Sequence, residues 1–247
     1  MSIIGLQLYS IKDELEKDFW GSLEKVKKAG YDAVEFAGFY GHSAKELKSA
    51  LANLGLMPLS AHVELDKEPA QTAKFAAELG LSYAIAPWVP HETLEACRAS
   101  NAMLKAAARI FAAEGVTVGF HNHWSEFEKY DGRYALDIIM DGVDGVYQID
   151  TGWVVKGGVD VLEYIRSLGD RVGPIHAKDI NADYVTRDPE DVNVCIGEGV
   201  IDLKAIIEQL RAAGTLSRGL IVEQEAFTVP MFEALAHNAR ALKAMVG

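Results

Sequence analysis

The sequence is poor in cysteine and proline and short of positive charge. Its 247 residues include only two cysteines, Cys97 and Cys195, and seven prolines. Two cysteines so far apart argue against a disulfide framework and against a thiolate metal site. Lys and Arg number 24 and Asp and Glu number 36, which gives a formal net charge of −12. This charge argues against a nucleic-acid partner, because gripping a phosphate backbone requires clustered cations.

Long apolar runs are also missing. No segment has the length and apolarity of a membrane span, and the N-terminal MSIIGLQLYS lacks the basic start of a signal peptide. We therefore expect a cytoplasmic protein with no membrane partner. Hydrophobic residues make up 49% of the chain, enough for a substantial core, and the length suits one domain over residues 1–247. The sequence leaves open whether the protein forms a homo-oligomer.

Short apolar runs of strand type alternate with stretches of helical periodicity. The predicted strands are Ile3–Ser10, Ala33–Ala37, Met57–His62, Tyr83–Trp88, Val116–His123, Gly145–Asp150, Pro174–Asp179 and Gly219–Glu225. The predicted helices are Phe19–Ala29, Ala44–Leu54, Ala70–Leu79, His91–Ala113, Ala135–Met140, Val161–Leu168, Leu203–Ala213 and Pro230–Met245. This order predicts an α/β fold, a single closed (β/α)₈ TIM barrel. A doubly wound open sheet is the alternative, although no GxGxxG follows the first strand.

Polar residues lie where a barrel core would be apolar. Strand side chains alternate between two faces, and barrel active sites lie at the C-terminal ends of the strands. Alternation predicts these inward-facing polar or aromatic residues near the strand ends: Gln7, Tyr9, Glu35, Ser60, His62, Trp88, His121, His123, Gln148, Asp150, His176, Lys178, Glu223 and Glu225. On the fourth strand the inner face is read as Ala84, Ala86 and Trp88. The irregular stretch Asn181–Gly199 is either a functional loop or a surface insertion.

Charged groups inside a barrel are costly unless they share a partner. The residues that most need such a shared partner are His121, Asp150, His176 and Glu223. A divalent metal ion would supply it, and imidazole with carboxylate ligands suits Mn²⁺, Zn²⁺, Co²⁺ or Fe²⁺ better than Ca²⁺. The alternative is a hydrogen-bonded polar network, or salt bridges to Lys178.

Seven short motifs resemble those of a known family. They are Gly5–Ser10 (GLQLYS), Ala33–Gly38 (AVEFAG), Ser60–Val63 (SAHV), Phe120–Phe127 (FHNHWSEF), Gln148–Trp153 (QIDTGW), Ile175–Asp179 (IHAKD) and Val222–Glu225 (VEQE). Through them the chain resembles, nearly end to end, the xylose isomerase-like TIM barrel superfamily, in the group called sugar phosphate isomerases/epimerases. The combination of DTG, HxKD and the late VE is specific to the superfamily but does not identify a substrate.

The resemblance implies metal ligands on the fifth to eighth strands, usually Glu, Asp, His and Glu. The last three match Asp150, His176 and Glu223, whereas His121 stands where many members have the first Glu. His121 can still bind a metal through an imidazole nitrogen. The other candidate ligands at this position are His123 and Glu126. Because the missing Glu is also an acid–base residue in related ketose epimerases, a mechanism with two Glu residues is in doubt.

The resulting prediction is a divalent-metal-dependent sugar isomerase or epimerase, with manganese among the candidate ions. It would abstract a proton next to a carbonyl through a metal-stabilised enediolate. The alternatives are a keto-sugar or keto-inositol dehydratase or lyase with the same metal site, an abasic-site endonuclease that the charge disfavours, and a sugar-binding barrel without turnover. The expected catalytic residues are Glu223, His121, Lys178 and Glu225. The expected substrate-binding residues are Glu35, His62, Trp88, His123, Trp153 and Tyr9.

Overall fold

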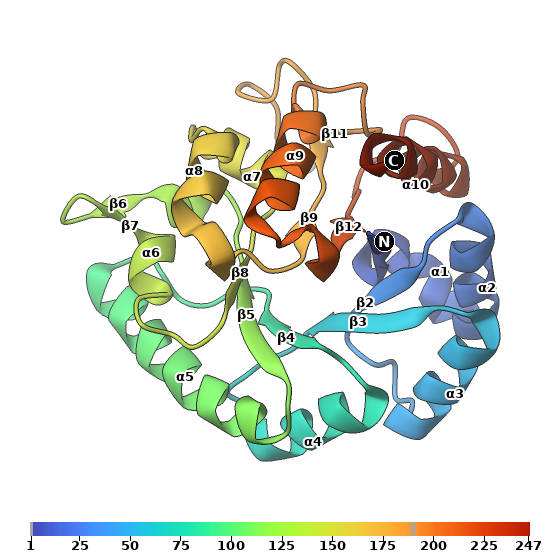
Figure 1. Ribbon diagram of the computed structural model, residues 1–247, viewed down its shortest axis with the longest axis horizontal. Helices are drawn as coiled ribbons and strands as arrows, with labels where there is room; N and C mark the ends of the chain where they lie inside the picture. The colour runs from blue at the N-terminus through green and yellow to red at the C-terminus, as the bar shows by residue number, and fades with distance from the viewer. Residues whose placement is uncertain (1, 189–190) are drawn as a thin grey trace.

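The centre of the molecule is an eight-stranded parallel sheet rolled into a nearly closed barrel. The computed structural model describes residues 2–188 and 191–247. The strand order is β8-β5-β4-β3-β2-β1-β12-β9, and the isolated bridges Tyr147–Val172 and Asp150–His176 connect the last pair of neighbours. Helices surround the strands as an outer ring (Figure 1). The predicted (β/α)₈ barrel is confirmed, and the open-sheet alternative is wrong.

The barrel strands lie at the predicted places, but six of them end earlier than expected. They are β1 (Ile4–Gln7), β2 (Ala33–Ala37), β3 (Met57–His62), β4 (Tyr83–Ala86), β5 (Thr117–His121), β8 (Val146–Gln148), β9 (Ile175–His176) and β12 (Leu220–Val222). After β8, for example, Asp150 leaves the ladder to become the N-cap of a helix. Some of the predicted polar residues, such as His121 and His176, are therefore the last residues of their strands, whereas others, such as Asp150, lie on the connections that follow.

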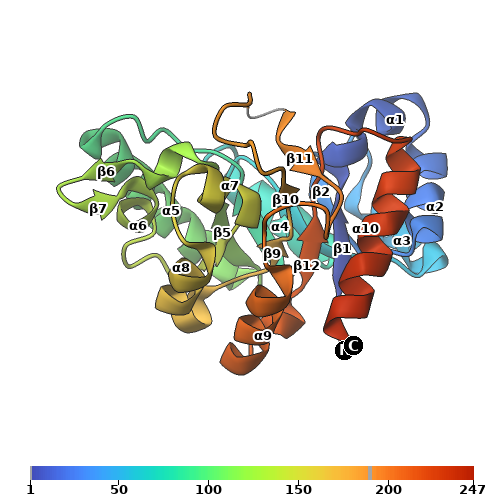
Figure 2. The same cartoon turned by 90° about the horizontal axis from the view of Figure 1, so that it is seen from above.

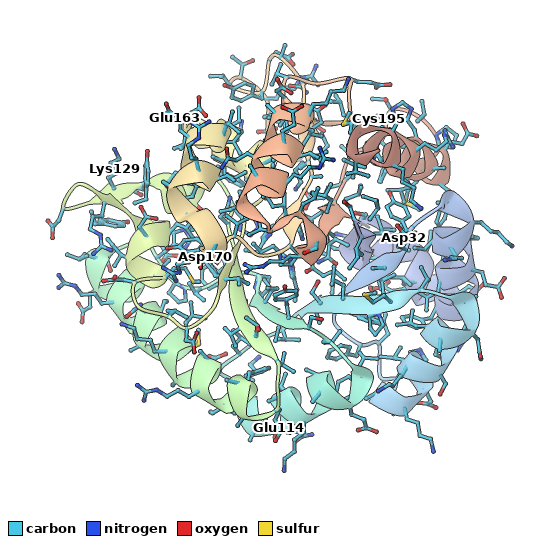
Figure 3. All side chains as sticks on the ribbon, in the orientation of Figure 1. Asp32, Glu114, Lys129, Glu163, Asp170 and Cys195 are labelled. Atoms are coloured by element: carbon cyan, nitrogen blue, oxygen red, sulfur yellow. The ribbon has the colours of Figure 1, made fainter. Side chains whose placement is uncertain are left out.

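Eight helices match the predicted ranges to within three residues. They are α2 (Phe19–Ala29), α3 (Ala44–Leu54), α4 (Pro69–Leu79), α5 (Leu94–Ala113), α6 (Ala135–Ile139), α8 (Val161–Leu168), α9 (Leu203–Ala213) and α10 (Met231–Val246). Ser43 and Glu46 form a capping box at the start of α3, and α3 ends at Gly55 with a left-handed φ of 65°. Charged side chains such as Glu114 and Glu163 lie on the outside of this ring (Figure 3).

Several short elements in the connections were not predicted. They are α1 (Lys12–Lys17), α7 (Thr151–Lys156), the hairpins β6–β7 (Lys129–Tyr130, Arg133–Tyr134) and β10–β11 (Asp179–Ile180, Asn193–Val194), and the 3-10 turns Leu8–Ile11, Ser125–Phe127, Gly169–Arg171 and Leu216–Arg218. Figure 2 shows α1, α7 and both hairpins on one side of the barrel. Most of these elements follow barrel strands, so they build the rim at the strands' C-terminal ends.

One carboxylate joins the two ends of the connection after β9. Asp179 accepts hydrogen bonds from the backbone N–H groups of Gly197 (2.9 Å), Gly199 (3.0 Å) and Ile201 (3.1 Å). The predicted irregular stretch Asn181–Gly199 is thus partly ordered by β10–β11 and by Asp179, while its residues 189–190 lie outside the described residues. Within the described chain, no helix combines the length and apolarity needed to cross a bilayer.

The predicted inner face of the fourth strand is wrong. Ile85 lies in register with His62 on one side and with Gly119 on the other. Residues in register on neighbouring parallel strands share a face, so Ile85 points inward. Ala84 and Ala86 instead pack in the layer between sheet and helices. Both faces of this strand are buried and apolar, so hydrophobicity could not distinguish them.

Candidate metal centre

Four buried side chains converge at the C-terminal ends of consecutive barrel strands. They are His121, Asp150, His176 and Glu223, and one candidate ligand atom from each lies within 4.8 Å of the others. The register explains the convergence, because His121 pairs with Gln148 and Ile221 pairs with His176. Asp150 and Glu223 each follow two residues after one of these paired positions and so share the inner face. The structure thus brings together the four side chains that the sequence analysis named as candidate metal ligands.

Buried polar atoms without a hydrogen-bond partner are concentrated here. Of eight such atoms in the described part of the chain, five belong to this region: His121 Nδ1, His123 Nδ1, Glu126 Oε1, Asp150 Oδ2 and Trp153 Nε1. Buried polar groups in folded proteins are nearly always hydrogen-bonded, and two of these atoms, His121 Nδ1 and Asp150 Oδ2, belong to the four-residue cluster and can coordinate a cation. An imidazole nitrogen and a carboxylate oxygen are ligands that Mn²⁺ and Zn²⁺ accept. The residues present therefore fit a divalent cation better than a self-contained polar network.

Lys178 is a buried cation beside this cluster. Its Nζ lies 3.1 Å from Glu223 Oε2, 3.2 Å from Asp150 Oδ2 and 3.8 Å from Glu225 Oε2. Burial disfavours the ammonium, but the three carboxylates outweigh that and raise the pKa of Lys178 above its usual range. The ring of Trp153 covers it, with Nζ 4.2 Å from the ring centre. This environment favours the charged form of Lys178, which suits the side chain to stabilise negative charge.

The two histidines of the cluster differ in charge. Burial lowers the pKa of His121 well below its usual range, and the neighbouring histidines add to that effect. His121 is therefore neutral, which is the form that coordinates a metal. Burial also disfavours the charged form of His176, but Glu35 and Glu223 outweigh it and raise the pKa of His176 to about 10. Its Nε2 lies 2.6 Å from Glu35 Oε1, and its Nδ1 lies 3.2 Å from Glu223 Oε2.

Glu35 does not lie where the prediction placed it. Glu35 was predicted to bind substrate at the mouth of the barrel, but its side chain is fully buried, with an exposed fraction of 0%. Its carboxylate accepts hydrogen bonds from Gln7 Nε2 (2.8 Å), Ser60 Oγ (2.5 Å) and Gln148 Nε2 (2.6 Å), below the cluster of four candidate ligands. Strand alternation correctly gave the face of Glu35 but not its depth. The structure thus places Glu35 against other side chains inside the barrel rather than at its mouth.

Three of the predicted substrate-binding residues border the cluster. The ring centres of His62 and His123 each lie 5.0 Å from that of His121. Their side chains are 10% and 32% exposed, respectively. Trp153 is only 3% exposed, and its ring centre lies 6.3 Å from that of His123. Trp88 is different, since it is 52% exposed and its ring neighbours His91 at 6.1 Å.

A cavity of about 250 Å³ opens next to Glu225. Tyr9, Lys12 and Phe227 are among its lining residues, and Lys12 Nζ donates a hydrogen bond to Tyr9 Oη at 2.8 Å. Glu225 also lies 3.8 Å from Lys178, so this carboxylate connects the cavity to the cluster. Tyr9, at 42% exposure, is thus placed as a cavity wall rather than as a member of the cluster.

A series of polar contacts behind His123 was not predicted from the sequence. Glu126 Oε1 lies 3.6 Å from His123 Nδ1, and Glu126 Oε2 lies 3.1 Å from the Ser125 hydroxyl. The same hydroxyl lies 3.0 Å from Nε2 of His91, for which no function was predicted. Glu126 and Ser125 belong to the FHNHWSEF motif, which is a detectable signal. Nothing in the sequence pointed to His91, because its contact depends on a loop from another strand.

Comparisons with known proteins agree with the fold. A family model described as xylose isomerase-like TIM barrel matches residues 23–245. A sugar phosphate isomerase/epimerase from Parabacteroides distasonis ATCC 8503 is 25% identical, with a TM-score of 0.85 over 100% of both chains. The IolI protein, solved with a bound zinc atom, is 18% identical, with a TM-score of 0.74 over 99% of this chain and 98% of that one. The probable 3-DHS dehydratase AsbF from Bacillus anthracis is 14% identical, with a TM-score of 0.74 over 98% and 99%. No curated protein matches the sequence at a significant level.

Proposed function

The chain belongs to the xylose isomerase-like TIM barrel family, and on that premise we propose that it is a divalent-metal-dependent sugar isomerase or epimerase. The observation that carries this proposal is the convergence of His121, Asp150, His176 and Glu223 to within 4.8 Å. The cluster lies at the end of the barrel where enzymes of this fold hold their active sites. The similarity to a sugar phosphate isomerase/epimerase over the whole chain supports the same reaction class.

The substrate is proposed to be a small sugar or keto-sugar. A divalent ion held by the four ligands would polarise the carbonyl and make the neighbouring C–H acidic. Lys178, a fixed cation 1% exposed, would stabilise the oxygen that gains negative charge. Trp153 covers Lys178 and keeps water from it. The zinc atom in IolI supports a divalent ion, and Mn²⁺ is the first ion to test.

Two rim residues are proposed to move a proton at the substrate. Glu225 reaches the cluster from the connection after β12, with its side chain 27% exposed. His123 reaches it from the connection after β5, 32% exposed and backed by Glu126. In the barrel β8 and β9 separate these two strands, so the two groups approach a bound sugar from different directions. Such an arrangement suits removal of a proton by one group and its return by the other.

A keto-sugar or keto-inositol dehydratase or lyase is the second candidate. It would use the same proton abstraction and then expel a hydroxyl or a glycosyl oxygen from the next carbon. His121, in place of the Glu that related epimerases use as an acid–base residue, favours this alternative. The similarity to the probable dehydratase AsbF supports it as well.

Solvent isotope exchange separates these functions. Metal-loaded protein is incubated with keto-sugars and keto-inositols in D₂O, and the products are followed by NMR and mass spectrometry. A product that keeps the substrate's formula and carries deuterium on carbon supports an isomerase or epimerase, whereas loss of water or an aglycone supports the lyase. Glu225→Gln should abolish exchange, and Glu233→Gln on the exposed face of α10 should not. Metal binding without exchange or product in any substrate would refute both candidates.

A further inference from the structure

One buried carboxylate joins five strands directly beneath the candidate metal centre. Glu35 of β2 is 0% exposed, whereas the interior below it is apolar, with Ala33, Leu59 and Ile221 as its core. Its oxygens contact side chains from β1, β3, β8 and β9, namely Gln7, Ser60, His62, Gln148 and His176. A side chain that only connected these strands would be apolar at this depth, because burying a carboxylate is costly.

Two of these contacts determine the protonation of imidazole nitrogens. Nε2 of His176 lies 2.6 Å from Glu35 Oε1, and Nε2 of His62 lies 3.1 Å from the same oxygen. A carboxylate oxygen only accepts hydrogen bonds, so Nε2 of His176 must carry a hydrogen and donate it to Glu35. Nε2 of His62 must also carry a hydrogen, because its nearer neighbour, Gln148 Oε1 at 2.8 Å, is likewise an acceptor. A divalent ion that binds at Nδ1 displaces the hydrogen from that atom, so the coordinating ring keeps its hydrogen on Nε2 and uses the Nδ1 lone pair. The two rings are stacked, with 5.5 Å between centres and 7° between planes, as expected for two rings held by one carboxylate.

The Nδ1 atom of His176 points toward the other three candidate ligands. It lies 3.2 Å from Glu223 Oε2 and 3.9 Å from Asp150 Oδ2, both of them proposed ligand residues. Glu35 thus holds the far side of the ring while the near side faces the cation position. Ligating histidines commonly donate their other N–H to a carboxylate, which fixes the ring and raises its basicity.

We propose that Glu35 is a positioning residue of the metal centre, which fixes the tautomer and orientation of His176 so that Nδ1 binds the ion. Gln148 Oε1 at 2.8 Å and Glu35 Oε1 at 3.1 Å hold His62 in the matching tautomer. This proposal rests on the proposed function only in requiring that the cluster binds a divalent ion. It does not depend on which sugar is turned over or on whether the reaction is isomerisation or elimination.

The test measures Mn²⁺ affinity by isothermal titration calorimetry on metal-stripped protein. Glu35→Gln keeps the size of the side chain but removes its charge, and should weaken Mn²⁺ binding by about 10- to 100-fold. Ser60→Ala is the matched control, because it removes one hydrogen bond to Glu35 Oε2 and leaves the contact of Oε1 with His176 intact. We expect the Ser60→Ala affinity to stay within a few-fold of wild type. Equal affinities for Glu35→Gln and wild type would overturn the proposal.

A second measurement reads the tautomer directly and does not require a variant. In ¹⁵N-labelled wild-type protein loaded with Zn²⁺, the imidazole signals of His176 should show hydrogen on Nε2 and metal on Nδ1. Hydrogen on Nδ1 with metal on Nε2 would overturn the proposal even if Glu35→Gln fails to fold. If wild-type protein binds neither ion, the proposed function fails together with this inference. If wild-type protein binds Mn²⁺ and Zn²⁺ and only the Glu35 results disagree, the role of Glu35 is refuted and the proposed function is unaffected.

Discussion

Replacing Asp150 by asparagine separates two roles of this side chain. Oδ1 accepts a hydrogen bond from the backbone N–H of Trp153 at 2.9 Å and thereby caps α7. Oδ2 forms an ion pair with Lys178 Nζ at 3.2 Å and lies 3.9 Å from His176 Nδ1, on the side of the candidate ligand cluster. Asparagine caps helices as well as aspartate does, but it brings no charge to a cation. We therefore expect Asp150→Asn to keep the fold and lose the metal.

The magnitudes follow from these two roles. Without metal, Asp150→Asn should change the free energy of unfolding by less than about 1 kcal/mol, while Asp150→Ala should lose about 1 kcal/mol with the cap. With Mn²⁺ at 100 times the wild-type Kd, bound metal stabilises wild type by about 2.7 kcal/mol, but a 100-fold weaker variant by only about 0.4 kcal/mol. In a chain of this size these gains raise Tm by about 5–11 °C and about 1–2 °C, respectively.

The assay is differential scanning calorimetry of wild type and variants, each with a chelator and with Mn²⁺. Asp144→Asn removes a charge from an exposed surface position and serves as the matched control. It should show the full wild-type rise in Tm. The reasoning is refuted if Asp150→Asn retains that full rise, or if its metal-free form is several kcal/mol less stable than wild type.

Two further predictions concern the barrel itself. Burial outweighs the opposing effect of Arg171 and raises the pKa of Tyr147 to about 12, against about 10 in the unfolded chain. The stability it contributes is therefore full below pH 10 and is lost as the pH rises through 12, by about 2.7 kcal/mol; urea unfolding at pH 9 and 12 should show that Tyr147→Phe lacks this loss. A Cβ at Gly119 would overlap Ile85 Cδ1 and lie 3.0 Å from the Val146 carbonyl oxygen, whereas one at Gly5 meets nothing nearer than 3.5 Å. Gly119→Ala should thus cost about 1–3 kcal/mol in urea unfolding, and an equal loss in Gly5→Ala would contradict the overlap as its cause.

The sequence by itself determined the barrel and the four side chains that meet in it. Alternating strand and helix patterns predicted eight βα units, because each pattern follows from local backbone geometry. His121, Asp150, His176 and Glu223 could be placed on the inner face because polar residues stand out at period two in an apolar strand. On β4 the same reasoning failed, since Ala84 and Ile85 are both apolar and only the register with Gly119 shows which one points inward.

Only the tertiary structure decided depth, pairing and exposure. Alternation put Glu35 on the correct face, but the stagger of the strands placed it below the cluster, where it contacts His176 instead of the mouth. The contacts of Lys178 with carboxylates on two other strand ends, and of His91 with Ser125, likewise join residues far apart in the chain. These features depend on how strands and loops pack against one another, and no local pattern of residues records that packing.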